Sequence, residues 1–191
     1  MILGSSNARG IKLTNNKSFM VTNRCIGGAT IKNLYKQLTS TNAQQDPIEA
    51  NFPKEYDFFI IFQGINGYDV SNWNSFTIDF KMAMEDLEKR GLPKRKTIVI
   101  GPLPRGNQTQ IWKHQMKSSA KLLNDLEKKG YNTINVYEEL PKDRRTPQKI
   151  FGHRDFTTQR YVHYGPYVIN TINMLTERKI MDITNNTTKE N

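Results

Sequence analysis

The chain has 191 residues, of which 36% are hydrophobic, and this composition is typical of one soluble globular domain with a sizeable core. No apolar run approaches the ~20 residues that a membrane-spanning helix needs. The formal net charge is +10 and the single cysteine, Cys25, excludes an internal disulfide and a cysteine-based zinc site.

Apolar stretches alternate with helical patterns along the whole chain. Short strands are predicted at residues 1–3, 19–21, 56–62, 97–100 and 133–136. Apolar spacing and terminal residues predict helices at residues 29–38, 75–91, 110–130 and 166–180. This alternation predicts an α/β fold in three αβα layers, with a five-stranded, mainly parallel sheet covered by helices on both faces. The domain is expected to span residues 1–180, followed by a disordered polar tail at 181–191.

Three of the predicted strands end in small, glycine-containing turns. These turns are residues 4–7 (GSSN), 26–29 (IGGA) and 63–69 (QGINGYD). In an open parallel sheet, ligands bind in the crevice at the carboxyl ends of the strands, and glycine lets the backbone approach a ligand closely. The sequence therefore predicts that the three turns share one site.

Four short blocks along the chain resemble those of the SGNH (GDSL-type) hydrolase family, in the family's order. The first is "ILGSSNARG", with Ser6 at the nucleophile position, and the second is "NRCIGGATI", with Gly28. The third is "IIFQGINGYDV", with Asn66, and the last is "RYVHYGPYVI", with His163. The resemblance covers the chain from Gly4 to about Leu175.

The resemblance implies a flavodoxin-like SGNH hydrolase fold and a serine esterase that acts on a small acyl ester. Ser6 is then the nucleophile and His163 its base, because acyl transfer needs a hydroxyl and a group that takes its proton. The backbone amides of Ser6 and Gly28, with the Asn66 side-chain amide, are expected to form the oxyanion hole. The sequence shows no metal motif or cofactor fingerprint, so no cofactor is expected.

The chain departs from the family pattern at three positions. Ser5 stands where the family has aspartate in the first block, and Gly67 replaces the aspartate of the third. Arg160 occupies the position of the triad carboxylate, three residues before His163. Asp155 is one candidate replacement, and a Ser-His dyad without a carboxylate is the other.

Each block also has a purely structural interpretation. The turn at 4–7 is compatible with a cap for the following helix, and IGGA with a tight strand-to-helix connection. Asn66 between glycines is typical of a turn, and His163 is compatible with an ordinary residue before the last helix. The joint occurrence of the four blocks in order favours the hydrolase interpretation.

The positive charge motivates an alternative, a non-catalytic SGNH-like domain that binds RNA or another nucleic acid through a basic surface. Two dense clusters stand at residues 88–96 and 141–149. The candidate nucleic-acid-binding residues are Lys94, Arg95, Lys96, Arg144, Arg145, Arg154 and Arg160. Candidate base-stacking aromatics are Trp73, Trp112, Tyr161 and Tyr164, although core packing is the commoner role of such residues. A basic surface with no nucleic-acid partner is the simplest reading of the charge alone.

The N-terminus lacks a secretory signal pattern, and the single cysteine fits a reducing compartment. An intracellular, cytoplasmic location is therefore expected. The very short first strand leaves open that the chain is a piece of a longer polypeptide. The sequence leaves the oligomeric state and the substrate's acyl and leaving groups open.

Overall fold

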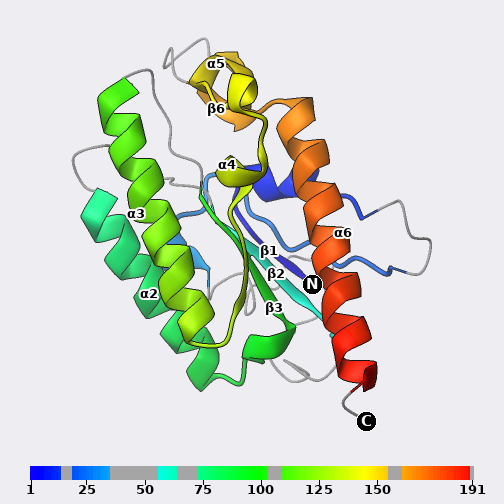
Figure 1. The fold of residues 1–191 in the computed structure, drawn as a ribbon. Coiled ribbons are helices and arrows are strands. Elements are labelled where there is room, and N and C mark those ends of the chain that lie inside the picture. The colour runs from blue at the N-terminus through cyan, green and yellow to red at the C-terminus, as the bar shows by residue number, and fades with distance from the viewer. Residues whose placement is uncertain (14–18, 35–55, 64–72, 103–108, 155–160, 190–191) are drawn as a thin grey trace.

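The computed structural model describes residues 1–13, 19–34, 56–63, 73–102, 109–154 and 161–189 (Figure 1). A parallel sheet lies at the centre, with strands β1 (Ile2–Gly4), β2 (Phe59–Phe62), β3 (Thr97–Ile100) and β4 (Asn132–Ile134) in the order β1-β2-β3-β4. Nearly every residue of these strands is buried. Burial on both faces explains why the strands read as continuous apolar runs.

Helices cover both faces of the sheet, as predicted. Helices α2 (Trp73–Lys89) and α3 (Thr109–Lys128) lie on one face, and α6 (Pro166–Lys189) lies on the other (Figure 1). Alternate strand residues therefore enter two separate cores. The core beneath α6 includes Ile2, Ile60, Ile98, Val168 and Ile172. The core beneath α2 and α3 includes Leu3, Ile61, Val99, Phe80 and Leu122. Among the described helices, none is long and apolar enough to cross a membrane.

The predicted fifth strand at residues 19–21 is not confirmed. The chain instead makes one parallel bridge between Asn23 and Ile2 at the outer edge of β1. The Ile2 amide donates to the Thr22 carbonyl at 2.8 Å, and the Arg24 amide donates to the Ile2 carbonyl at 2.9 Å. Within the segment predicted as a strand, Met20 is 99% exposed, whereas Phe19 packs against the core.

The helix predicted at residues 29–38 is described only in its first half. A short 3₁₀ helix, η2 (Ile31–Asn33), replaces an α-helix there, while Ile31 and Leu34 are buried against the sheet as the apolar spacing predicts. Residues 35–38 lie outside the described residues.

The predicted disordered tail at 181–191 is wrong for most of its length, because α6 continues to Lys189. The apolar spacing of the helix extends past the predicted end: Ile180 is buried, and Ile183 packs against the same core. The Thr184 hydroxyl donates to the Ile180 carbonyl at 2.9 Å within this segment. The polar composition of residues 181–191 therefore outweighed the signal from Ile183, an apolar residue that continues the core-facing side of the helix. Residues 190–191 lie outside the description.

The sequence analysis missed a second, two-stranded antiparallel sheet. It is formed by β5 (Phe151–Arg154) and β6 (Tyr161–Tyr164), with His153 opposite His163. Between β4 and β5 the chain forms α4 (Val136–Glu139), the 3₁₀ helix η5 (Lys142–Arg144) and α5 (Pro147–Ile150). These short elements and the small sheet lie near the carboxyl ends of the central strands (Figure 1).

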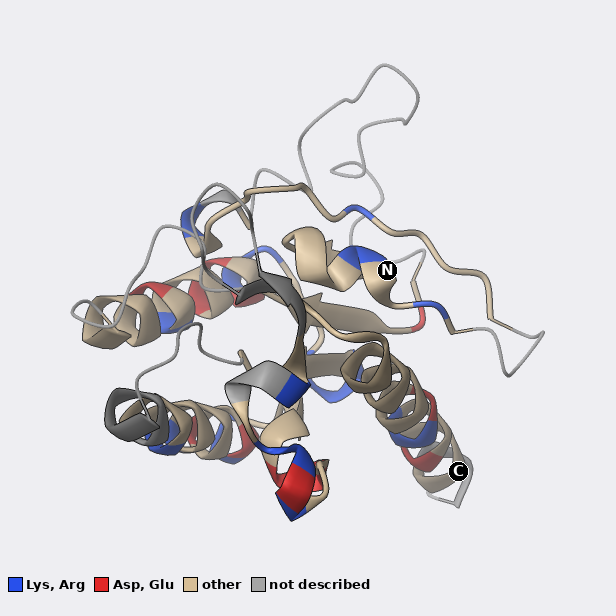
Figure 2. Ribbon diagram, turned by 90° about the horizontal axis from the view of Figure 1, so that it is seen from above, with Lys and Arg blue, Asp and Glu red and all other residues tan. Residues whose placement is uncertain are grey.

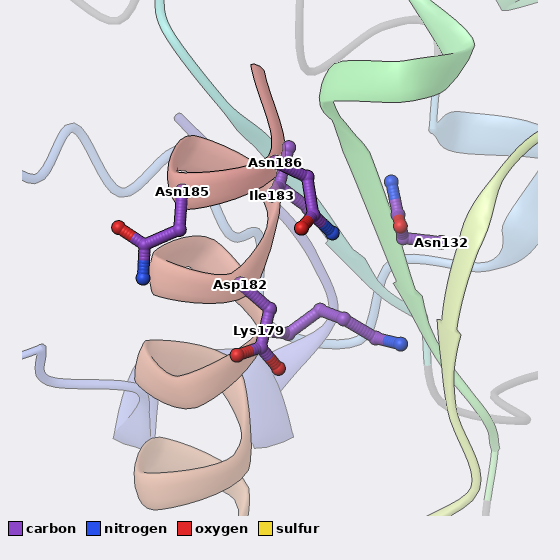
Figure 3. Close-up of a pocket in the computed structure, with 6 residues that line it drawn as sticks. All are labelled: Asn132, Lys179, Asp182, Ile183, Asn185 and Asn186. Carbon is purple, nitrogen blue, oxygen red and sulfur yellow. The ribbon is translucent and has the colours of Figure 1, made fainter. Parts of the chain in front are cut away.

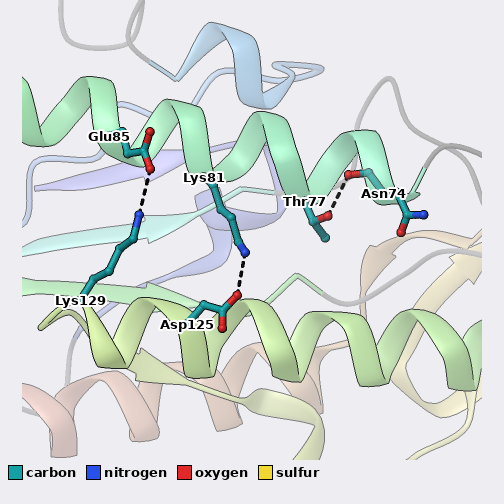
Figure 4. A network of polar contacts seen from close by, with 6 residues as sticks. All are labelled: Asn74, Thr77, Lys81, Glu85, Asp125 and Lys129. Atoms are coloured by element: carbon teal, nitrogen blue, oxygen red, sulfur yellow. Dashed lines mark hydrogen bonds and ion pairs between the residues drawn. The ribbon is translucent and has the colours of Figure 1, made fainter.

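Ion pairs join α2 to α3 on the outside of the molecule (Figure 4). The Lys81 ammonium lies 2.6 Å from Asp125, and the Lys129 ammonium lies 2.9 Å from Glu85. These lysines lower the pKa of both carboxyl groups, chiefly through hydrogen bonds. Because the pairs are largely exposed, solvent screens them and the apolar packing beneath contributes more to the helix contact.

Candidate active site

The Ser6 turn begins where β1 meets the backbone of β2. A side chain on Gly4 would bring its Cβ within 2.1 Å of the Phe62 carbonyl oxygen, so only glycine fits this register. The chain then enters the 3₁₀ helix η1 (Ser6–Gly10), with the Ala8 amide donating to the Ser5 carbonyl at 3.0 Å. Ser5 is fully buried, whereas Ser6 is half-buried. The candidate nucleophile is thus at the carboxyl end of the sheet, with partial access to solvent.

A buried hydrogen bond ties this turn to the segment that carries His163. The Tyr164 backbone amide donates to the Asn7 side-chain oxygen at 3.2 Å, across 157 positions of sequence. Ser6 precedes Asn7, and His163 precedes Tyr164, so the two candidate catalytic residues are direct neighbours of the bonded pair. The sequence predicted that these two segments meet, and they do.

Ring packing holds β6 in this place. The Tyr164 ring stacks on Phe62 with centroids 5.5 Å apart and lies 5.3 Å from the Phe151 ring. Tyr164 is buried and His163 is exposed, as expected for consecutive residues of a strand. Neither Asn7 nor Tyr164 was singled out for this role, although both stand beside the residues that the blocks identified.

No hydrogen bond joins the Ser6 hydroxyl to the His163 imidazole within the described part of the chain. Contacts between a nucleophile and its base are often longer without substrate and tighten only in the reacting complex. The structure therefore places the two residues on neighbouring segments without forming the catalytic contact.

The Gly27-Gly28 turn is anchored to the ends of β1 and β2. The Ile26 amide donates to the Gly4 carbonyl at 3.1 Å, and the Gln63 side-chain amide donates to the Ala29 carbonyl at 2.7 Å. Gly28 is exposed and has φ of +73°, a conformation that side-chain-bearing residues rarely adopt. Gly4, residues 26–29 and Gln63 are therefore joined by hydrogen bonds, whereas residues 64–69, the rest of the third predicted turn, lie outside the described residues.

One catalytic candidate, two of the three departures from the family pattern and the candidate replacement carboxylate lie outside the described residues. These positions are Asn66, Gly67, Asp155 and Arg160. Neither a third oxyanion donor nor a carboxylate partner for His163 is therefore placed. Within the described part of the chain, no group of three or more histidine, cysteine or acidic residues is arranged to hold a metal ion.

Cys25 lies close to the same turn but does not have the character of an activated thiol. Burial raises the pKa of its thiol to about 12, and the positive charge of Arg9 offsets only part of this rise. Its sulfur lies 3.9 Å from the Ile2 carbonyl oxygen. Because the thiolate is the reactive form of cysteine, the Ser6 hydroxyl is the better candidate nucleophile in this region.

Lys and Arg are spread over several elements of the molecule (Figure 2), and the described candidate nucleic-acid-binding residues come from both ends of the central sheet. Lys94, Arg95 and Lys96 form the 3₁₀ helix η4 (Lys94–Lys96) before β3, at the amino end of the sheet. Arg144 and Arg145 follow β4, at its carboxyl end, and Arg154 belongs to β5. The two basic clusters of the sequence thus lie at opposite ends of the central strands.

Several of these cations are engaged within the protein. Arg145 donates to the Leu140 carbonyl at 2.8 Å and to both the carbonyl and carboxylate of Glu138, at 2.6 and 3.1 Å. Lys94 pairs with Glu88 at 2.5 Å. Arg144 is more open and lies over the Tyr167 ring at 5.0 Å. Arg145 therefore has a structural role that its sequence cluster did not reveal.

The candidate stacking aromatics are also divided. Trp73 and Tyr164 are buried in the two cores, so base stacking is wrong for both and the core-packing interpretation applies. The side chains of Trp112 and Tyr161 lie outside the description.

Two cavities among the described residues lie at the other end of the sheet from Ser6. One of about 500 Å³ opens between the start of β4 and the last turns of α6, and its walls are mostly polar (Figure 3). Its lining residues are Asn132, Lys179, Asp182, Ile183, Asn185 and Asn186. A second, of about 670 Å³, is bordered by Met1 and Phe58 at the starts of β1 and β2. Neither of these two cavities includes the candidate active site, which is located by the turns that meet near Ser6.

Comparison with known proteins adds no family assignment. No protein-family model matches the sequence, and no curated protein matches it.

Proposed function

We propose that the chain is an SGNH-type serine ester hydrolase in which Ser6 and His163 form a catalytic dyad. The observation that carries the proposal is the buried bond from the Tyr164 amide to Asn7, because it fixes the two candidate residues on adjoining segments. If the Asn23 bridge is counted as a rudimentary strand, the sheet has the sequence order 2-1-3-4-5 of flavodoxin-like folds. That order supports the SGNH-like layout.

In the proposed reaction, the Ser6 oxygen attacks the carbonyl carbon of a small acyl ester while His163 takes the hydroxyl proton. The carbonyl oxygen then carries negative charge, and the Ser6 and Gly28 backbone amides stabilise it together with the Asn66 side chain. His163 returns the proton to the departing alcohol, which leaves an acyl-serine. Water, activated by the same imidazole, releases the acid and restores Ser6.

The proposal is tested by labelling with a fluorophosphonate probe, which reacts covalently with activated serines. We expect the wild-type chain to be labelled and Ser6→Ala to remain unlabelled, because the reactive oxygen is removed. Ser75→Ala, at an exposed position of α2, is the matched control and should label like wild type. Equal, poor labelling of wild type and Ser6→Ala would exclude the enzyme.

The second candidate function is nucleic-acid binding without catalysis. The net charge of +10 favours it, as does the exposure of Arg95 and Lys96 at the amino edge of the sheet. Filter binding to single-stranded RNA at several salt concentrations tests it. If RNA binding displaces counterions, the affinity must fall steeply as the salt concentration rises. The double variant Arg95→Gln with Lys96→Gln should make this salt dependence less steep. A flat or absent response rejects this candidate.

A further inference from the structure

Arg9 lies on the same side of η1 as the candidate nucleophile. Ser6 is the first residue of this 3₁₀ helix and Arg9 is the fourth. A 3₁₀ helix has three residues per turn, so side chains at i and i+3 stand one above the other. Ser6 is half-buried and Arg9 is exposed, so both residues have access to solvent.

The Arg9 guanidinium rests against the Gly27-Gly28 turn. A Cβ on Gly27 would lie 3.0 Å from one terminal nitrogen of Arg9 and 3.3 Å from its central carbon. Gly27 thus leaves room for the planar cation, whereas Gly28 supplies the positive φ of the turn. The two glycines have different roles, and together they place a positive charge beside the proposed oxyanion donor.

The charge of Arg9 is available to a ligand. Within the described part of the chain, no carboxylate forms an ion pair with Arg9, whereas Arg90, Arg145 and Arg178 each have an acidic partner. Its field reaches the neighbouring Cys25, where it opposes the rise in pKa caused by burial. An exposed guanidinium with free donors is well suited to binding a carboxylate.

We infer that Arg9 is a specificity residue that selects esters carrying a carboxylate close to the bond that is cleaved. The inference rests on the proposed hydrolase function and names the charge class of its substrate. The guanidinium binds the substrate's carboxylate while Ser6 attacks the ester carbonyl, so the negative group is held at the outer side of the turn.

The test compares two acetyl esters that differ in charge, 3-acetoxybenzoate and 3-acetoxybenzamide. We expect wild type to have a kcat/KM about tenfold higher for the anionic ester, and Arg9→Gln to lose that preference with less than a twofold change for the neutral ester. Arg9→Lys should retain the preference in part, and added salt should weaken it. Lys117→Gln, which removes the same charge at an exposed position of α3, is the control and should behave like wild type.

Equal losses on both esters in Arg9→Gln, or no loss on either, would overturn the role of Arg9. A wild-type chain that cleaves neither ester would instead reject the hydrolase. In that event, a separate experiment tests whether Arg9 binds a carboxylate. The amide NMR shifts of Gly27 and Gly28 are followed during titration with 3-hydroxybenzoate. Shifts present in wild type and lost in Arg9→Gln support the site, and unchanged spectra reject it.

Discussion

Replacing His163 by alanine is expected to lower kcat/KM for ester hydrolysis by about 10²- to 10⁴-fold, the usual contribution of a general base. KM should change little, because the imidazole acts on a proton that moves in the transition state. The side chain is exposed on β6, so its loss should leave the Tyr164 packing and the fold intact. Initial rates across substrate concentrations, with circular dichroism as a check on folding, measure the effect.

His114→Ala provides the matched control, because His114 is an exposed histidine on α3 and should tolerate the change within twofold. A sharper expectation concerns the double variant Ser6→Ala with His163→Ala. Residues that act as one unit lose their joint contribution when either is removed, so the double variant should be no slower than Ser6→Ala alone. Multiplied losses in the double variant, or a His163→Ala enzyme as fast as wild type, would contradict the dyad.

The central sheet and the three long helices α2, α3 and α6 were predictable because local signals agree with the fold. Residues 97–100 form a fully buried parallel strand, and the sequence has the apolar run expected of such a strand at residues 98–100. Helix α2 has apolar residues at helical spacing, and the buried Phe76, Phe80 and Met84 lie on its inner face. Where a local residue pattern is compatible with only one secondary-structure element and one degree of burial, the sequence alone is sufficient to predict the structure.

The small sheet was not predictable, because β5 and β6 form by pairing with each other and β6 is held in place by a hydrogen bond to Asn7. The segment "YVHY" alternates between buried Tyr164 and exposed His163, but four residues before a proline are equally compatible with the approach to a helix. Its position depends on a bond to a side chain 157 residues away. Similarly, Arg144 and Arg145 are indistinguishable by charge, and it is the Leu140 carbonyl together with the carbonyl and carboxylate of Glu138 that give Arg145 its structural role. Long-range partners of this kind leave no local signal.

Gly4→Ala is expected to lower the free energy of unfolding by about 3 kcal/mol or more, at the upper end of the range for forced overpacking. The added Cβ would lie 2.1 Å from the Phe62 carbonyl oxygen and 2.9 Å from the Ala8 Cβ. Flexible side chains can move away from a new methyl group, but the backbone carbonyl belongs to β2, which pairs with β1 at this point. Relief therefore requires the two strands to separate. Urea denaturation, with the slope checked for two-state behaviour, measures the loss.

Gly28→Ala is the informative comparison, because it is strained for a different reason. Nothing lies within 4 Å of the position of its Cβ, and only the φ of +73° opposes the substitution. A left-handed conformation costs an ordinary residue about 1–2 kcal/mol, so this variant should be clearly more stable than Gly4→Ala. Gly4→Ala should also displace η1 and its Ser6, since the clash falls between β2 and the residue that begins the turn. If the two variants lose equal stability, the close approach of β1 and β2 at Gly4 is not what positions the Ser6 turn.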